Sequence, residues 1–429
     1  MVLLFGMSVE QFIANRITLS NKGKNNISKP IVKIGITGIA LGISVMILTV
    51  GIVLGFKHEI ISKITGITSH ITISSINLNN SNEPSPLKLP DDTLKMLKDL
   101  PFLKHIQPTA VKNGIIKTKT ENEGVLLKGV SNEFDFTFFE KYLSEGKLPV
   151  YTDTGVSKDI FISKKLADRL NIKTGQKLLA YFLTTKKNTD TVFANRGYAE
   201  LEKRSRAFNI CGIFNTGFAE FDENLAIVDL KQIQKLNYWE NNEAGSYELF
   251  LNDFNTLDEN VEAVQELLGY NYRIMPVNEA YANIFSWLEM VDVNGIIIIS
   301  LMLMVAGVNM ITALLILILE RANMIGLIKA MGMSNVSVRK VFFYVSLKLL
   351  WRGLLIGNII GIGAVLLQYY FHLVKLDSTT YYVEYVPVIF NISYILILNL
   401  GIIACCMLMM FFPTLILTRI TPIKTLRFD

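Results

Sequence analysis

The chain has 429 residues, 51% of them hydrophobic, and a mean hydropathy of +0.37, which is too apolar for a protein that folds only in water. Its formal net charge is +5. Much of this positive excess lies beside long apolar segments. The charge therefore reflects membrane topology and does not indicate a nucleic-acid partner.

Four segments are apolar enough to cross a membrane. A helix needs about 20 apolar residues to span the hydrocarbon core, where its backbone must be hydrogen-bonded internally. The predicted spans are 34–56, 294–319, 341–371 and 389–417. Lys348 and Arg352 lie near the entry of the third span, so we expect both side chains to extend to the interface. A functional charge pair inside the membrane is the alternative.

The basic residues beside these spans predict the orientation of the chain. They gather in segments 1–33, 320–340 and 418–429, which the positive-inside rule places in the cytoplasm together with both termini. Segments 57–293 and 372–388 then lie on the outer side. The first span has no signal-peptidase site after it, so we expect an uncleaved, multi-pass membrane protein.

Local patterns predict further elements. In segment 1–33 an amphipathic helix begins after Ser8, and we expect it to lie on the inner membrane face. Segment 57–293 alternates strand and helix patterns, which predicts an α+β domain. The predicted strands are 71–76, 114–120, 124–130, 177–182 and 208–214. The predicted helices are 91–100, capped by Asp91, then 160–170, 258–268 and 278–293, which continues into the second span.

Residues with catalytic or metal-binding spacing are missing from the sequence. No Gly-x-x-x-x-Gly-Lys-Ser/Thr loop is present, and His58 and Glu59 begin a zinc-protease motif without its second histidine. We therefore expect no catalytic residue, no bound metal or cofactor, and no enzyme activity. Cys211 is the only cysteine of segment 57–293, which excludes a disulfide within it.

Glycines recur at intervals of four residues in two predicted spans. Such spacing lets helices approach closely in lipid, so we expect helix contacts there, with ordinary tolerance of glycine in membrane helices as the alternative. Asn309 is expected to bridge helices by hydrogen bonding. The glycines with this spacing are Gly38 and Gly42, Gly51 and Gly55, and Gly353, Gly357 and Gly361.

Several motifs together resemble one family. The segments SVEQFIANRI, ITGIALGISVMI, FNICGIFNTGFAEF, NMITALLILILERANMIGLIKAMG and PIKTLR are similar to those of the lipoprotein-releasing permeases, the LolC/LolE family. This family belongs to the type VII ABC transporters, with MacB and FtsX. The resemblance implies a MacB-like core, residues 57–110 and 241–293, with an inserted β-rich subdomain, residues 111–240.

The family resemblance also implies a partner in the cytoplasm. A LolD-like ATPase dimer, which uses ATP and Mg²⁺, would dock on a coupling helix within segment 320–340. An amphipathic helix that rests on lipid is the alternative. The implied coupling residues are Glu320, Arg321, Ile325, Leu327, Ile328, Lys329 and Met331.

On the outer side, the resemblance implies a lipoprotein substrate and a LolA-like carrier. The substrate would enter a cavity between the first spans of two permease subunits, lined in part by Val45, Ile47 and Val53. Whether the second subunit is a copy or a related chain stays open. A hook within 181–206 would bind the carrier, although this stretch is longer and more basic than in the family, so a solvated basic loop is the alternative. The candidate hook residues are Lys186, Phe193, Arg196 and Tyr198.

The predicted function is therefore that of a permease subunit. It would extract lipoproteins from the inner membrane and pass them to a periplasmic carrier by mechanotransmission, with ATP hydrolysed by a separate subunit. Two alternatives are a MacB-like efflux permease and an FtsX-like signalling scaffold for a cell-wall hydrolase.

Overall fold

The computed structural model describes residues 8–19, 28–76, 84–118, 121–185 and 201–416. The chain splits into two compact units. The helical unit comprises Met1–Lys57, Trp287–Lys375 and Val386–Asp429, and the α/β unit comprises His58–Ser286 and Leu376–Tyr385.

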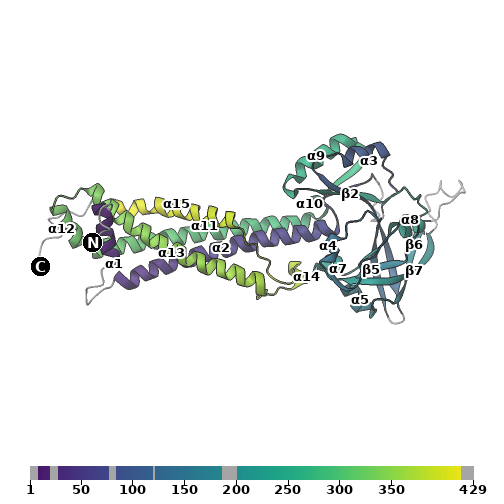
Figure 1. The fold of residues 1–429 in the computed structure, drawn as a ribbon, viewed down its shortest axis with the longest axis horizontal. Coiled ribbons are helices and arrows are strands. Elements are labelled where there is room, and N and C mark those ends of the chain that lie inside the picture. Colours follow the sequence, from purple (N-terminus) through teal and green to yellow (C-terminus); the bar gives the residue numbers. More distant parts are fainter. Residues whose placement is uncertain (1–7, 20–27, 77–83, 119–120, 186–200, 417–429) are drawn as a thin grey trace. The chain divides into compact units, whose positions relative to one another are not determined.

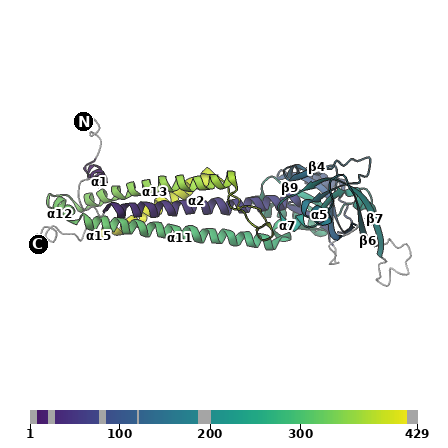
Figure 2. The ribbon, with the colours of Figure 1, turned by 90° about the horizontal axis from the view of Figure 1, so that it is seen from below.

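Over the described residues, four helices are long and apolar enough to cross a membrane, as the sequence predicts. They lie side by side in both views of the ribbon (Figures 1 and 2). Two shorter helices belong to the same unit. The helices are α1 (Val9–Leu19), α2 (Ser28–Ile67), α11 (Ala282–Glu320), α12 (Ala322–Ala330), α13 (Asn335–Phe371) and α15 (Ile392–Ile416). Helices α2 and α11 continue from the helical unit into the α/β unit.

The helical unit has an apolar core shared by its long helices. Ile39 and Ile43 of α2, Met310 of α11 and Val345 of α13 are fully buried in it. Two polar side chains between its helices are paired with each other. The side-chain amides of Asn358 on α13 and Asn399 on α15 exchange two hydrogen bonds of 2.8 and 2.9 Å. Such reciprocal pairing satisfies amides that lipid cannot solvate.

The α/β unit is built on one sheet, in which the described residues contribute ten strands in the order β10-β1-β9-β2-β3-β8-β5-β7-β4, with β6 paired to β2 and β7. The pairs β3–β8 and β5–β7 are parallel and the others antiparallel. The strands are β1 (Ile71–Ser75), β2 (Leu103–Lys117), β3 (Asn122–Val130), β4 (Leu143–Gly146), β5 (Asp159–Ser163), β6 (Lys177–Thr185), β7 (Leu201–Phe214), β8 (Leu225–Asp229), β9 (Ser246–Leu251) and β10 (Tyr272–Pro276).

Short helices cover this sheet, and two apolar clusters fill the space between them. One cluster lies under α5 and α8, and the other is rich in phenylalanine, including Phe139, Phe161 and Phe214. The helices are α3 (Asp91–Lys98), α4 (Thr137–Glu140), α5 (Lys164–Leu170), α7 (Ala219–Asp222), α8 (Leu230–Asn237), α9 (Leu257–Leu268), α10 (Val277–Ala280), α14 (Ser378–Tyr381) and the 3₁₀ helices η1 (Phe254–Thr256) and η2 (Gly269–Asn271).

The predicted helix 160–170 is wrong in its first part. Residues Asp159–Ser163 form strand β5 in the sheet between β7 and β8, and Ser163 then caps α5 by accepting a hydrogen bond from the Leu166 amide at 3.2 Å. Four consecutive buried residues, Ile160–Ser163, make this a strand covered on both faces. A short apolar run of this kind has no period that separates strand from helix.

Two other helix predictions also need correction. Helix α3 begins after Pro90 without a side-chain cap, so Asp91 is its first residue and not its cap. The predicted helix 278–293 is interrupted at Tyr281, whose φ of −117° and ψ of 41° are not helical, and α11 begins at Ala282. Strand β1 and helix α9 lie where the sequence predicts them, and the predicted hairpin is formed by β2 and β3, although β2 begins at Leu103 and not at Gly114.

Candidate functional site

The coupling segment predicted at 320–340 folds as a helix between two turns. Arg321 leaves the helical conformation after α11, with φ −100° and ψ 13°, and α12 follows. Gly332 turns the chain with φ +93°, a conformation that favours glycine. Ser334 then caps α13 by accepting a hydrogen bond from the Ser337 amide at 3.2 Å. The two turns make α12 a distinct element at the end of the bundle.

The structure divides the predicted coupling residues between two environments. Ile325 is 1% exposed and belongs to the core of the helical unit, so it does not present itself to a partner. Leu327 and Met331 are 52% and 79% exposed. Glu320 is also exposed, whereas Arg321, Ile328 and Lys329 are half-buried. Among the predicted coupling residues, the exposed apolar side chains are therefore Leu327 and Met331.

Helix α1 adds a second element to this end of the bundle, and both ribbon views place it near α12 and the start of α13 (Figures 1 and 2). It packs on α13, with Ala14 fully buried. Its first turn is capped by Ser8, whose hydroxyl accepts a hydrogen bond from the Gln11 amide at 3.3 Å. Backbone hydrogen bonding at the helix start and a bond from Ser337 lower the pKa of the Glu10 carboxyl. The sequence predicted a helix lying on the membrane and did not reveal this contact.

The glycines spaced four residues apart in the predicted spans lie at close contacts. Gly38 and Gly42 of α2 face Asn309 and Ala306 of α11. On α13, the three glycines face α2: a methyl group added at Gly357 would lie 2.7 Å from Ile43 Cβ and 2.8 Å from the Ala40 carbonyl oxygen. Gly353 and Gly361 contact Ile39 and Ile47 in the same way. Helix α2 is therefore packed by glycine contacts on two sides.

The residues predicted to line a substrate cavity do not share one surface. Ile47 is buried in the helical core and contacts Gly361, and Val53 packs against Gly295 of α11. Val45 is half-exposed, four residues after the exposed Leu41, and so lies on the outward face of α2. Spacing alone could not reveal which face of a uniformly apolar helix is covered by its own chain.

The four candidate hook residues, Lys186, Phe193, Arg196 and Tyr198, lie outside the described residues. The strands that lead to them form the antiparallel pair β6–β7, from Lys177 opposite Asn209 to Thr185 opposite Leu201.

One face of this strand pair is exposed and partly apolar. Leu179 and Leu183 of β6 and Ile115 of the neighbouring β2 are exposed on it. The Lys203 ammonium lies 4.7 Å from the centre of the Tyr181 ring, in cation–π geometry. The base of the hairpin thus combines apolar and basic side chains.

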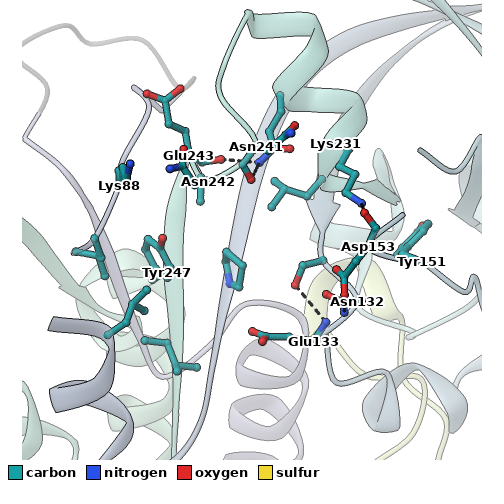
Figure 3. A pocket seen from close by; sticks show the side chains of 18 of the residues that line it. Lys88, Asn132, Glu133, Tyr151, Asp153, Lys231, Asn241, Asn242, Glu243 and Tyr247 are labelled. Atoms are coloured by element: carbon teal, nitrogen blue, oxygen red, sulfur yellow. Dashed lines mark hydrogen bonds between the residues drawn. The ribbon is translucent and has the colours of Figure 1, made fainter. Parts of the chain in front are cut away.

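A polar pocket of about 410 Å³ lies elsewhere in the α/β unit (Figure 3). Asn132, Asp153 and Lys231 form one wall, and Lys88 and Glu243 lie on the other. The Lys231 ammonium donates to the carbonyls of Thr152, Asp153 and Gly155, and Asn132 donates to the Asp153 carboxylate at 2.9 Å. These internal bonds hold neighbouring loops together, which gives the polar groups a structural role. Within the described residues, no group of three histidine, cysteine or acidic side chains is placed to hold a metal ion.

Two family models match the chain in sequence order. Residues 34–267, more than half of the chain, match the MacB-like periplasmic core domain, and residues 296–422 match the FtsX-like permease C-terminal model. Together they leave out residues 268–295, which include β10 and the start of α11.

Relatives of the same length carry names from one transport system. The chain is 21% identical to the lipoprotein-releasing system transmembrane protein LolC of Xylella fastidiosa, over 96% of this chain and 97% of that protein. It is also 21% identical to LolE of Haemophilus influenzae, over 85% and 86%. The solved periplasmic region of MacB from Actinobacillus actinomycetemcomitans is 14% identical, covers 52% of this chain and 95% of that one, and has a TM-score of 0.33. The resemblance to LolC and LolE stated from the motifs is confirmed by these relatives.

Proposed function

Because the chain belongs to the family of MacB-like and FtsX-like permeases, we propose that it is the permease subunit of an ABC transporter that releases lipoproteins from the inner membrane. It is a multi-pass inner-membrane protein. The observation that carries the proposal is the end-to-end similarity to relatives named as lipoprotein-releasing transmembrane proteins. The proposed substrate class comes from the names of these relatives, and the four candidate spans and the α/β unit come from the chain itself.

The proposed energy source is a separate cytoplasmic ATPase that binds ATP and Mg²⁺. An ATPase dimer has two equivalent docking grooves, so the transporter would contain two permease chains. Helix α12 is the proposed docking element, because its exposed Leu327 and Met331 can enter an apolar groove while Ile325 anchors the helix to the core. In this arrangement both termini and α12 lie in the cytoplasm.

Movement of α12 would reach the α/β unit through continuous helix. Helix α11 has 39 residues and ends directly before the turn at Arg321, after which α12 begins. Helix α2 has 40 residues. Both continue from the helical unit into the α/β unit. A helix transmits axial and tilting motion without rearranging its hydrogen bonds, so ATP-driven closure of the partner would act on the outer domain by mechanotransmission.

The proposed substrate face is the outward side of α2. Ile34 and Leu41 are exposed there, and Val45 continues the same face. In a two-subunit transporter, two such faces would enclose an apolar cavity for acyl chains. The carrier would bind at the β6–β7 hairpin, and the exposed Leu179, Leu183 and Ile115 support contact with a protein partner near its base.

Depletion of the protein in its host tests this function. The expected result is that lipoproteins accumulate in the inner membrane, as followed by membrane fractionation and labelling of their acyl chains. A plasmid copy of the chain should restore their delivery. Delivery that continues at the normal rate after depletion would contradict the proposal, and a defect confined to cell-wall cleavage would favour the signalling scaffold.

A further inference from the structure

The segment between α13 and α15, residues 374–389, is tied into the structure at both its base and its tip. We call it the strap. Its two ends belong to the helical unit, whereas Leu376–Tyr385 belong to the α/β unit. The sequence predicted only a short outer loop at 372–388. The strap is therefore a covalent connection between the units in addition to α2 and α11.

The base of the strap is held by one buried amide. Gln368 of α13 donates through Nε2 to the carbonyls of Val374 and Val386, at 3.3 and 3.0 Å, and accepts a hydrogen bond from the Val374 amide at 3.0 Å. The Val386 amide also donates to the Val374 carbonyl at 3.0 Å. These bonds hold the outgoing and returning legs together at the end of the third span.

The returning leg is also bound to α2. The Ile389 amide donates to the Gly51 carbonyl at 3.0 Å, and an added methyl group at Gly55 would lie 2.8 Å from Val388 Cα. Gly51 and Gly55 thus give the strap a close approach to the α2 backbone. This contact accounts for the second glycine pair of the first span.

The tip of the strap is held by an aromatic stack and a carboxylate. The Tyr382 ring stacks on Phe218 with centroids 5.1 Å apart and an interplanar angle of 24°. Asn215 donates to the Glu384 carboxylate at 3.4 Å, and the Glu384 carbonyl accepts from the Leu376 amide at 2.9 Å. Tyr382 has φ +61°, which is unfavourable for a tyrosine, so its contacts must offset the strain of this conformation.

The Asn215–Asp222 loop, which receives the tip of the strap, also has hydrogen bonds of its own. The fully buried Asp222 carboxylate accepts hydrogen bonds from the Thr216 hydroxyl at 2.8 Å and the Gly217 amide at 2.8 Å. The Ser163 hydroxyl donates to the Asp222 carbonyl at 2.6 Å. This is the FNICGIFNTGFAEFD stretch, which the proposed coupling, substrate and carrier contacts leave without a role.

The C-terminal part of α2 lies beside the Asn215–Asp222 loop and the strap. A cavity of about 120 Å³ is lined by Glu59 and Lys63 of α2, by Tyr142, and by Glu384 of the strap. The buried Lys63 ammonium lies 3.7 Å from the Glu59 carboxylate and 5.7 Å from the centre of the Tyr142 ring.

From this geometry we infer that the strap is a third mechanical attachment, which fastens the ends of α13 and α15 to the Asn215–Asp222 loop through Tyr382 and Glu384. The inference that this attachment serves transport rests on the proposed function. In that setting, movement of the third and fourth spans acts on the outer domain directly, and not only through α2 and α11.

The attachment is tested first without transport. Hydrogen exchange is measured on the full chain in lipid nanodiscs for wild type, Tyr382→Ala and the control Tyr381→Ala. The side chain of Tyr381, next to Tyr382 in the sequence, is exposed. Loss of the aromatic pair should raise exchange at the Thr216 and Gly217 amides about tenfold in Tyr382→Ala and leave it unchanged in the control. Unchanged exchange in Tyr382→Ala overturns the inference, whatever the protein transports.

Coupling is tested in the transporter reconstituted with its ATPase. Phe218→Ala, Tyr382→Ala and the double variant should keep ATP hydrolysis but release lipoprotein about tenfold more slowly, with the double variant no worse than either single one. Normal release by Tyr382→Ala, despite faster exchange, would overturn the coupling role. If wild type releases no lipoprotein, the proposed function fails, and the exchange experiment alone decides the attachment.

Discussion

At the residue scale, a buried ion pair joins the end of α2 to the sheet. The Lys128 ammonium lies 2.6 Å from the Glu248 carboxylate and donates to the Ile67 carbonyl, the last residue of α2, at 2.6 Å. Gln107 donates to the second carboxylate oxygen at 2.9 Å. Strands β2, β3 and β9 therefore supply one group each to a network that also satisfies a terminal helix carbonyl. Such a network fixes geometry, because each group needs its partners.

Removing one charge from this network should destabilise the α/β unit. In Lys128→Met, Glu248 stays buried without its counter-charge, and we expect a loss of about 3–5 kcal/mol in the free energy of unfolding. The matched control is the double variant Lys128→Met, Glu248→Gln, which removes both charges of the pair and should recover most of the loss. Denaturant unfolding of the full chain, with hydrogen exchange at β3 and β9, measures both. A single variant as stable as wild type would contradict the role of the pair.

His70 makes stability depend on pH. Burial, with a smaller effect of Lys104, lowers the pKa of His70 from 6.5 to about 4, and its neutral ring accepts a hydrogen bond from the Leu251 amide at 3.2 Å. The stability that His70 contributes is therefore complete above pH 6.5 and is lost as the pH falls towards 4. The full difference is about 3 kcal/mol.

We expect His70→Asn to flatten this dependence. Asparagine keeps an acceptor for the Leu251 amide but does not titrate. Unfolding free energies of the full chain at pH 7 and pH 4.5 should then differ less in the variant than in wild type. Equal pH dependence in the two proteins would show that His70 stays neutral, or titrates normally, in both states.

At the element scale, close helix contacts organise the membrane-spanning helices. Spacing of glycines at four residues is visible in the sequence, because a helix brings such residues onto one face. The partner of that face is not visible. In the structure, Gly353, Gly357 and Gly361 contact α2, while Gly38 and Gly42 of α2 contact α11.

A methyl group at the α13–α2 contact should separate these helices. Gly357→Ala would place Cβ 2.8 Å from the Ala40 carbonyl oxygen, which belongs to the backbone and cannot rotate away. We expect a loss of about 1–3 kcal/mol, measured by unfolding in detergent micelles. The matched control is Gly363→Ala on the same helix, where nothing lies within 4 Å of the added methyl. Equal stability of the two variants would contradict close packing at Gly357.

At the scale of the whole molecule, the proposed transporter depends on α12 and its ATPase. Leu327→Glu and Met331→Glu place a charge on the exposed apolar side of the segment. We expect co-purification of the ATPase to fall at least about tenfold, because each apolar side chain contributes about 1.5–3 kcal/mol when buried. Val336→Glu is the control: Val336 is 61% exposed in the first turn of α13, where an acidic residue suits the helix N-terminus. Normal ATPase binding by both α12 variants would exclude this docking surface.

The sequence predicts those parts of the fold that depend on whether a residue faces lipid, water or the protein core. Four spans follow from the cost of placing polar backbone in lipid, and strands such as β1 follow from alternating burial. The sequence does not predict features that depend on contacts between segments far apart in the chain. Whether Ile325 or Leu327 faces outward depends on the helices around α12, and the stack of Tyr382 on Phe218 joins residues far apart in sequence. The candidate hook residues remain untested predictions.

The position of β1 in the sheet has a consequence for how the protein is made. Ile71 of β1 pairs with Leu249 of β9 and Pro276 of β10, so the first strand to emerge lies between two of the last. In the proposed orientation, translocation must deliver everything from Ser75 to Ser246 before β1 gains a neighbour, roughly 10–30 s at ordinary rates of synthesis. The β2–β3 hairpin can form early, but the sheet closes only as α11 arrives to enter the bilayer. Completion of the outer domain and insertion of the second span are thereby linked in time, and until then β1 has neither of its partner strands.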